Sequence, residues 1–178
     1  MAKFEKVTKY KDVEFDMPVR KTKHSAGYDM VIAEDVILEP YDSQINKLFP
    51  LFKPVPSLMT LDELAGVSKT TKGRPTLVST GVKCKLDPGT YLELSVRSST
   101  PLKYWIVMAN GVGIIDADYY NNPDNEGEIF FQLINLSPVR IELKRGDIIG
   151  QGIIHSYGVT EDDAVFTERT GGFGSTSE

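Results

Sequence analysis

Cysteine is almost absent from this sequence of 178 residues: Cys84 stands alone, so no internal disulfide can form. Such scarcity is typical of a reducing, cytosolic setting. His24 and His155 are the only histidines, which excludes a Cys/His metal site with zinc-like spacing. The longest apolar run, from Tyr104 to Ala109, is far shorter than the ~20 residues of a membrane span. The N-terminal segment 1–6 lacks the apolar run of a signal peptide. We therefore expect a soluble, cytoplasmic protein.

Basic charge is also in short supply. The formal net charge is −5, which argues against a general nucleic-acid binder and against a membrane-surface binder. A nucleotide ligand stays open, because a small anion needs only a local cluster of donors. The length predicts one domain, 1–178, with a sizeable core.

Alternation of apolar and polar residues dominates the chain. It is clearest in residues 82–86 and 92–97, and further apolar runs cover 128–136 and 147–155. Turn signals separate these runs, at 87–89, 137–138 and 144–147. Many short strands joined by polar turns predict an all-β fold, either a sandwich, a jelly roll or a barrel.

Residues 40–75 interrupt this pattern. Four prolines lie between positions 40 and 56, and proline cannot supply the N–H that a central strand requires. Thr60 and Glu63 have the spacing of a capping box, and Gly66 predicts that the helix ends after little more than a turn. We interpret this range as a surface insertion with one short helix.

Residues 168–178 contain three glycines around one aromatic residue, Phe173, and no core-forming pattern. One interpretation is a disordered terminus. The alternative is a flexible arm that orders over a ligand, with its amides and hydroxyls on phosphate and its ring on a base.

An acidic segment follows two glycines near the middle of the chain. Asn110 and Gly113 come first, and Asp116, Asp118 and Tyr119 follow. In a strand the two carboxylates would share a face and Tyr119 would point away, unless the chain turns. The bland alternative is an acidic turn after a strand.

Three other segments contain residues that could bind a ligand or take part in catalysis. Arg97, Ser98 and Ser99 form a plausible phosphate cradle at a strand end, although such runs are common on surfaces. Asp29 follows a glycine and could orient a metal-bound water, or Gly27 could simply mark a hairpin or bulge. Gln151 interrupts an apolar strand, as a strand-edge residue or as a phosphate contact.

The order of these segments resembles the five motifs of the trimeric dUTPase family. The matching segments are 26–29, 97–99, 113–119, 150–151 and 169–176. The resemblance covers roughly residues 20–38 and 76–176. It implies a jelly-roll-like fold and a homotrimer whose subunits share each active site. It also implies Mg²⁺-dependent hydrolysis of dUTP to dUMP and pyrophosphate.

The resemblance also implies the catalytic roles. Asp116 would be the general base that activates the water attacking the α-phosphorus. Ser98 would donate toward the α–β bridging oxygen, and Gln151 would contact the α-phosphate or the water. Asp29 would hold a water in the Mg²⁺ shell.

Substrate binding would follow the same pattern. Arg97 and Ser99 match the family's phosphate-binding motif, and Asn110 and Gly113 would present backbone to the uracil edge. Tyr119 would stack under the sugar and exclude a 2′-hydroxyl.

The C-terminal arm would close the site. Arg169 would help to close it, Phe173 would cover the uracil, Gly174 would follow it, and Ser175 and Thr176 would bind the γ-phosphate.

Three features depart from the family pattern. Val96 replaces a frequent glycine, residues 120–126 lengthen what is usually a tight turn, and 40–75 is extra. The insertion at 40–75 leaves open a regulatory role through a protein partner. A dCTP deaminase shares the fold and an Arg-Ser-Ser motif, but relies on glutamate where Asp116 stands. A purely structural jelly-roll protein is a further alternative.

Overall fold

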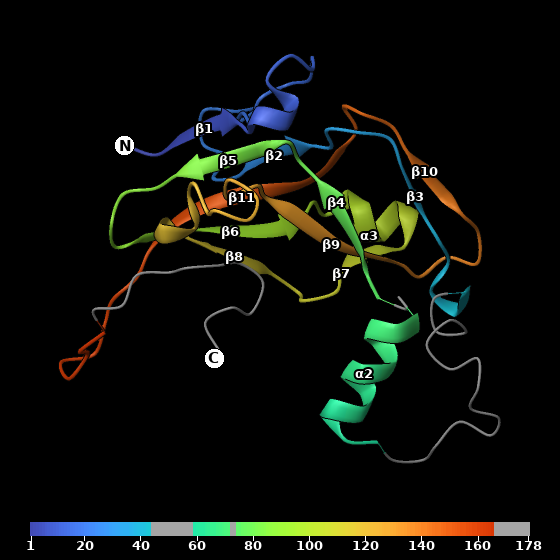
Figure 1. Ribbon diagram of the computed structural model, residues 1–178. Helices are drawn as coiled ribbons and strands as arrows, with labels where there is room; N and C mark the ends of the chain where they lie inside the picture. Colours follow the sequence, from blue (N-terminus) through green and yellow to red (C-terminus); the bar gives the residue numbers. More distant parts are fainter. Residues whose placement is uncertain (44–58, 72–73, 166–178) are drawn as a thin grey trace.

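The computed structural model describes residues 1–43, 59–71 and 74–165, most of which lie in short strands and connecting turns (Figure 1). The strands are β1 (Lys3–Lys6), β2 (Tyr28–Val31), β3 (Val36–Leu38), β4 (Thr76–Ser79), β5 (Val82–Lys85), β6 (Thr90–Val96), β7 (Ile106–Met108), β8 (Gly113–Asp116), β9 (Phe130–Asn135), β10 (Ile141–Leu143) and β11 (Ile148–Ser156). The helical elements are α2 (Leu61–Thr71), α3 (Ser99–Tyr104) and the 3₁₀ turns η1 (Thr8–Tyr10) and η2 (Ala117–Tyr119). The all-β prediction is confirmed.

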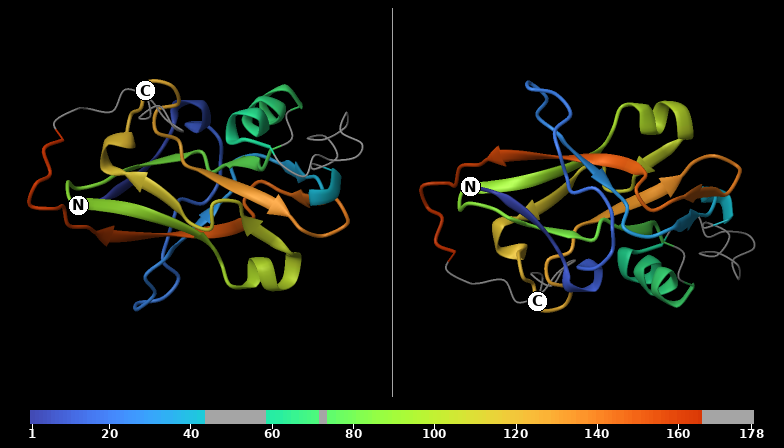
Figure 2. Two further views of the ribbon diagram at one scale, coloured as in Figure 1. Left: turned by 90° about the horizontal axis from the view of Figure 1, so that it is seen from below. Right: turned by 90° about the horizontal axis from the view of Figure 1, so that it is seen from above.

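The strands pair antiparallel, and many partners are distant in sequence. The four-stranded sheet has the order β2-β11-β6-β8, and the three-stranded sheet has the order β4-β9-β7. Two further pairs are β1-β5 and β10-β3. The orange-red strand in Figure 2 is β11, which pairs with β2 on one side and with β6 on the other. Non-local pairings of this kind are typical of jelly-roll-like folds.

The sheets enclose one main hydrophobic core. The alternation predicted for residues 92–97 is confirmed in β6, where Leu92 and Leu94 are buried and their neighbours in sequence are more exposed. β9, predicted only as part of an apolar run, alternates in the same way, with Phe131 and Leu133 buried. These four side chains belong to the same buried cluster, which joins the two larger sheets. Each such residue stabilises the fold by about 1.5–3 kcal/mol through burial.

The four-stranded sheet turns one face away from this core. Asp29 pairs with Gln151 and Gln151 pairs with Ser95 across β2, β11 and β6. Tyr91, four residues before Ser95 on β6, pairs with Asp116 on β8. Directly paired residues, and residues two or four apart on one strand, share a face. The outward face of this sheet therefore carries three of the predicted site residues.

The insertion contains the predicted capping box but a longer helix. The Thr60 backbone N–H donates to Glu63 Oε2 at 2.8 Å, and the Glu63 N–H donates back to Thr60 Oγ1 at 3.3 Å, so the box is confirmed. The predicted end at Gly66 is wrong, since α2 continues to Thr71. Gly66 lacks the positive φ of a helix-ending glycine, and a helical glycine costs only about 1 kcal/mol.

The α2 helix lies beside the body of strands (Figure 1). Its described side chains, Leu61 to Gly66, are exposed. Among the described residues, no helix is long and apolar enough to cross a membrane.

Candidate active site

Asp29 and Arg97 form the centre of one group of polar side chains at the end of the four-stranded sheet. Arg97 Nε lies 3.6 Å from Asp29 Oδ1, with side-chain exposures of 41% for Arg97 and 12% for Asp29. The second carboxylate oxygen of Asp29, Oδ2, is buried and has no hydrogen-bond partner. A buried acceptor of this kind is costly unless something donates to it. The site thus has a guanidinium that can reach an anion and a carboxylate oxygen that can accept from a bound water.

Gln151 is fixed beside this pair by its strand neighbours. Its Nε2 donates to Ser95 Oγ at 3.3 Å, and its backbone lies between β2 and β6. Gly27 approaches so closely that a Cβ there would collide with Gln151 Oε1. This close approach, rather than a bulge, is the reason for glycine in the Ala-Gly-Tyr-Asp segment. The bulge near this point lies instead in β11, between Ile148 and Gly150.

The Arg97-Ser98-Ser99 segment turns from β6 into α3. Thr100 anchors the turn, because its N–H donates to Arg97 O at 2.9 Å and its Oγ1 donates to Ile149 O at 3.3 Å. Ser98 is exposed at the start of α3, and its side chain makes no capping hydrogen bond. Its hydroxyl is therefore free of the helix and available to a ligand. We call Asp29, Arg97, Ser98, Ser99 and Gln151 the Arg97 cluster.

A second group lies on β8 and in the turns before and after it; β7 and β8 do not form a hairpin, because β7 pairs with β9 and β8 pairs with β6. Asn110 is exposed in the turn, where Val112 N–H donates to Asn110 O at 2.8 Å. Gly113 packs so closely on Leu94 that a Cβ would lie 3.2 Å from that side chain. Asp116 is exposed at the end of β8. We call Asn110, Gly113, Asp116 and Tyr119 the Asp116 segment.

Tyr119 does not follow the alternation of a strand, because the chain turns after Asp116. Residues Ala117–Tyr119 form η2, which brings the Tyr119 side chain inward to 5% exposure. Its hydroxyl donates to Glu128 O at 3.2 Å. Asp116 and Tyr119 thus belong to one rigid turn, with the carboxylate outside and the ring packed behind it.

The two groups lie at opposite ends of β6 within one chain. Asp116 pairs with Tyr91 near the start of β6, whereas Arg97 follows its last residue. Six residues of extended chain separate these positions by about 20 Å. The structure brings Asp29, Arg97 and Gln151 together, but a single chain does not bring them to Asp116.

Five predicted site residues, Arg169, Phe173, Gly174, Ser175 and Thr176, lie outside the described residues. Within 1–43, 59–71 and 74–165, no group of three or more His, Cys, Asp or Glu side chains could hold a metal ion. A cation beside the Arg97 cluster would be held by ligand oxygens and water, and Asp29 would accept a hydrogen bond from one of those waters.

The sequence interpretation missed three residues that contact the site. Ser95 holds Gln151, while Asn125 and Glu128 both hydrogen-bond to Tyr119. Ser95 was detectable, since it precedes Arg97 by two residues in an alternating strand. Asn125 had no such signal, because its contact depends on the shape of a loop.

Comparisons with known proteins agree with this arrangement. A family model described as dUTPase matches residues 65–177. The deoxyuridine 5′-triphosphate nucleotidohydrolase of Lactococcus lactis is 37% identical over 175 residues, which is 97% of this chain and 95% of that protein. The crystal structure of a dUTPase from Streptococcus mutans is 32% identical with a TM-score of 0.67, and the match covers 89% of this chain and 98% of that one.

A more distant likeness concerns fold alone. A mutant dUTPase from phage phi11 of S. aureus is 18% identical with a TM-score of 0.59, and the match covers 94% of this chain and 97% of that one. That structure describes the coordination of a structural Mg(II) ion in the phage enzyme. The jelly-roll-like architecture is thus shared beyond the range of clear sequence identity.

Proposed function

The chain belongs to the dUTPase family, and from that premise we propose that it hydrolyses dUTP to dUMP and pyrophosphate. The observation that carries the proposal is the outward face of the β2-β11-β6-β8 sheet. The Arg97 cluster, with its cation and its spare carboxylate oxygen, lies at one end of that face, and Asp116 lies at the other. The reaction limits the incorporation of uracil into DNA and supplies dUMP for thymidylate synthesis.

Hydrolysis needs a base for water and donors for the leaving group. Asp116 takes a proton from the water while the water oxygen forms a bond to the α-phosphorus. The bond from that phosphorus to the bridging oxygen breaks, and pyrophosphate leaves with the electron pair. Ser98 donates to the bridging oxygen, where charge develops, and Arg97 binds the phosphates. Gln151 orients the α-phosphate or the water.

We assign the selection of base and sugar to the Asp116 segment. Asn110 and Gly113 present backbone groups to the uracil edge, and the close packing there leaves no room for thymine's methyl group. Tyr119 stacks under the deoxyribose and leaves no room for a 2′-hydroxyl. Rejection by shape and by unpaired polar groups gives stronger selection than a size difference alone.

Mg²⁺ fits the Arg97 cluster as a cation held mainly by the triphosphate. Asp29 Oδ2, buried without a partner, is positioned to accept from a water of the ion's shell. When bound, Mg²⁺ neutralises phosphate charge and fixes the conformation of the triphosphate. Arg97 orients Asp29 through their ion pair.

A homotrimer with shared sites resolves the separation within one chain. In such a trimer the Asp116 segment of one copy would face the Arg97 cluster of the next. Each site would then contain both groups. A third copy would contribute the C-terminal arm, 168–178, with Arg169, Phe173 and Ser175 closing over dUTP. Two observations support this trimer. The two groups lie ~20 Å apart along β6 within one chain. Between them, the hydrophobic side chain of Ile114, which pairs with Glu93, is exposed and could be covered by another copy.

The setting of the enzyme is also part of the proposal. We place it in the cytoplasm, where nucleotide pools are found and where a single cysteine stays reduced. The exposed described part of α2, in the 40–75 insertion, is a surface that a protein partner could contact.

Pyrophosphate release tests the function. The assay compares dUTP with dCTP, dTTP and UTP in Mg²⁺, with Asp116→Asn as the reference. Hydrolysis of dUTP alone, reduced by about 100- to 10,000-fold in the variant, supports the proposal. A folded protein that hydrolyses none of the four, or that acts equally on dCTP, contradicts it.

A further inference from the structure

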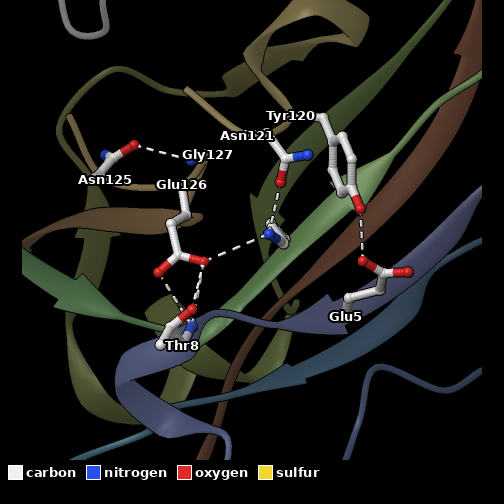
Figure 3. A network of polar contacts seen from close by, with 8 residues as sticks. Glu5, Thr8, Tyr120, Asn121, Asn125, Glu126 and Gly127 are labelled. Carbon is white, nitrogen blue, oxygen red and sulfur yellow. Dashed lines mark hydrogen bonds and ion pairs between the residues drawn. The ribbon is translucent and has the colours of Figure 1, made fainter. Parts of the chain in front are cut away.

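The loop at residues 120–126 is tied firmly to the N-terminal segment (Figure 3). The Glu126 carboxylate accepts from Thr8 N at 3.1 Å and from Thr8 Oγ1 at 2.9 Å. Lys83, mostly buried, donates to Asn121 Oδ1 at 2.6 Å and pairs with Glu126 at 3.4 Å. These hydrogen bonds hold the pKa of Glu126 below its usual range. The loop is thus fixed at both its ends.

A second attachment comes from Tyr120. Its hydroxyl donates to the Glu5 carboxylate at 2.5 Å, and Lys83 Nζ lies 5.1 Å from the centre of its ring. Tyr120 therefore points toward β1 and β5, as Figure 3 shows. Because Tyr120 points toward β1 and β5, Tyr119 is the aromatic residue of the Asp116 segment.

The backbone of the loop is strained in a way that sets its shape. Asn121 and Glu126 have backbone φ values of 61° and 60°, which residues other than glycine rarely adopt. The Asn121 N–H donates to Glu126 O at 3.1 Å, and the Glu126 N–H donates to Asn122 O at 2.7 Å. Strain of this kind persists only where surrounding contacts impose it, and it is common next to functional sites.

This shape directs Asn125 at the Tyr119 hydroxyl. Asn125 Nδ2 donates to Tyr119 Oη at 2.7 Å, and Asn125 Oδ1 accepts from Gly127 N at 3.0 Å. The amide is thereby held at both ends. The Tyr119 hydroxyl in turn donates to Glu128 O, so the ring is fixed between two partners on either side of Gly127.

We propose that Asn125 is a positioning residue for Tyr119, and that the 120–126 loop sharpens the discrimination between dUTP and UTP. The inference rests on the proposed function, since it concerns the ring that stacks under the sugar. A 2′-hydroxyl is a small feature, and rejecting it requires the ring to hold its place when a ribonucleotide binds. Asn125 supplies that resistance through the hydroxyl at the far end of the ring.

A double-mutant cycle tests the proposal. The variants are Asn125→Ala, Tyr119→Phe and their combination, each measured for kcat/KM with dUTP and with UTP. The matched control is Asp124→Ala, an exposed neighbour whose backbone N–H, rather than its side chain, donates to Asn122. Asn125→Asp is the second variant, because it keeps an acceptor for Gly127 N and removes the amide donor.

Loss of one such hydrogen bond should lower the dUTP/UTP ratio of kcat/KM by about three- to tenfold in Asn125→Ala. The ratio should also fall in Asn125→Asp and stay at the wild-type value in Asp124→Ala. In the Tyr119→Phe background, Asn125→Ala should change the ratio less than about twofold, because its partner is already gone.

An unchanged ratio in both Asn125 variants overturns the proposal, and so does an equal effect with and without the Tyr119 hydroxyl. Either result leaves dUTP hydrolysis by the wild type intact, so the proposed function survives. A wild type that hydrolyses no dUTP overturns both.

Discussion

The Arg97 guanidinium lies 3.6 Å from the Asp29 carboxylate, from Nε to Oδ1, although 68 positions separate the two residues in the chain. β11 lies between their strands and presents Gln151 beside them. The pair leaves Asp29 Oδ2 buried and without a partner. A carboxylate in this position orients the arginine and keeps one oxygen that, under the proposed function, would accept from a ligand or its water.

Asp29→Asn tests the role of this carboxylate toward the metal ion. The substitution keeps the shape and removes the charge that favours a hydrated cation. The Mg²⁺ concentration for half-maximal dUTP hydrolysis should rise by about 10- to 100-fold, as for other residues that orient metal-bound groups. Metal titration of the activity measures this, and an unchanged Mg²⁺ dependence would rule out the assigned role. Asp118→Asn, beside the other half-site, serves as the charge-matched comparison.

Gly27→Ala tests the packing of Gln151. A Cβ at position 27 collides with Gln151 Oε1 and lies 2.9 Å from its Cδ, so the Gln151 amide must shift from its present position. We expect kcat/KM for dUTP to fall by about 10- to 100-fold, since small displacements of positioning groups are costly. Gly89→Ala is unsuitable as a control because φ there is +77°. Gly158→Ala, with open space around it, should leave kcat/KM unchanged. Equal activity in Gly27→Ala would count against the assignment of Gln151.

Glu128→Gln should change how stability depends on pH. Burial raises the pKa of Glu128, which is 7% exposed and accepts a hydrogen bond from Ser79 Oγ. A carboxyl with a raised pKa binds its proton more tightly in the folded state than in the unfolded state. Its contribution to the free energy of unfolding is therefore present below the ordinary value of 4.5 and is lost as the pH rises through the folded pKa.

The glutamine variant lacks this titration. The melting temperature of Glu128→Gln minus that of the wild type should therefore rise between pH 4.5 and neutrality. Thermal unfolding across that range measures the difference. A constant difference would show that the carboxyl titrates normally. Taking the difference removes the opposite contribution of Glu126, whose pKa is lowered.

Removal of residues 169–178 should affect activity and leave the core intact. Arg169, Phe173, Ser175 and Thr176 are the proposed closing contacts, and the buried cluster is formed by residues before β11 ends. We expect kcat/KM for dUTP to fall by at least about tenfold, because the closed site excludes water and fixes the triphosphate. The melting temperature should stay within about 2 °C, since the buried cluster of the described residues is retained. A large fall in melting temperature would contradict the assignment of these residues to an arm.

Much of the fold was predictable because it depends on short-range pattern. Alternation in residues 92–97 predicted the strand that buries Leu92 and Leu94, and the capping box at Thr60 and Glu63 formed as expected. The end of α2 was not predictable from Gly66, because an exposed helical glycine costs too little to stop a helix.

The site was only partly readable from the sequence. Motif order pointed to Asp29, Arg97, Asp116 and Gln151, and the structure places three of them together. The Arg97–Asp29 ion pair depends on the order β2-β11-β6, which no local pattern encodes. The contact from Asn125 to Tyr119 depends on positive φ values in a seven-residue loop, so it too required the structure.

Complementation between two inactive variants tests the central claim, which is a dUTP-hydrolysing site built from two copies of this chain. Asp116→Asn destroys one half-site and Arg97→Ala destroys the other. Each variant alone should be nearly inactive. The two variants are mixed in equal amounts, unfolded and refolded together, and assayed with dUTP. About a quarter of the sites should then combine an intact Asp116 segment with an intact Arg97 cluster. Activity near a quarter of the wild-type value supports the shared site, whereas a mixture no more active than its components contradicts it.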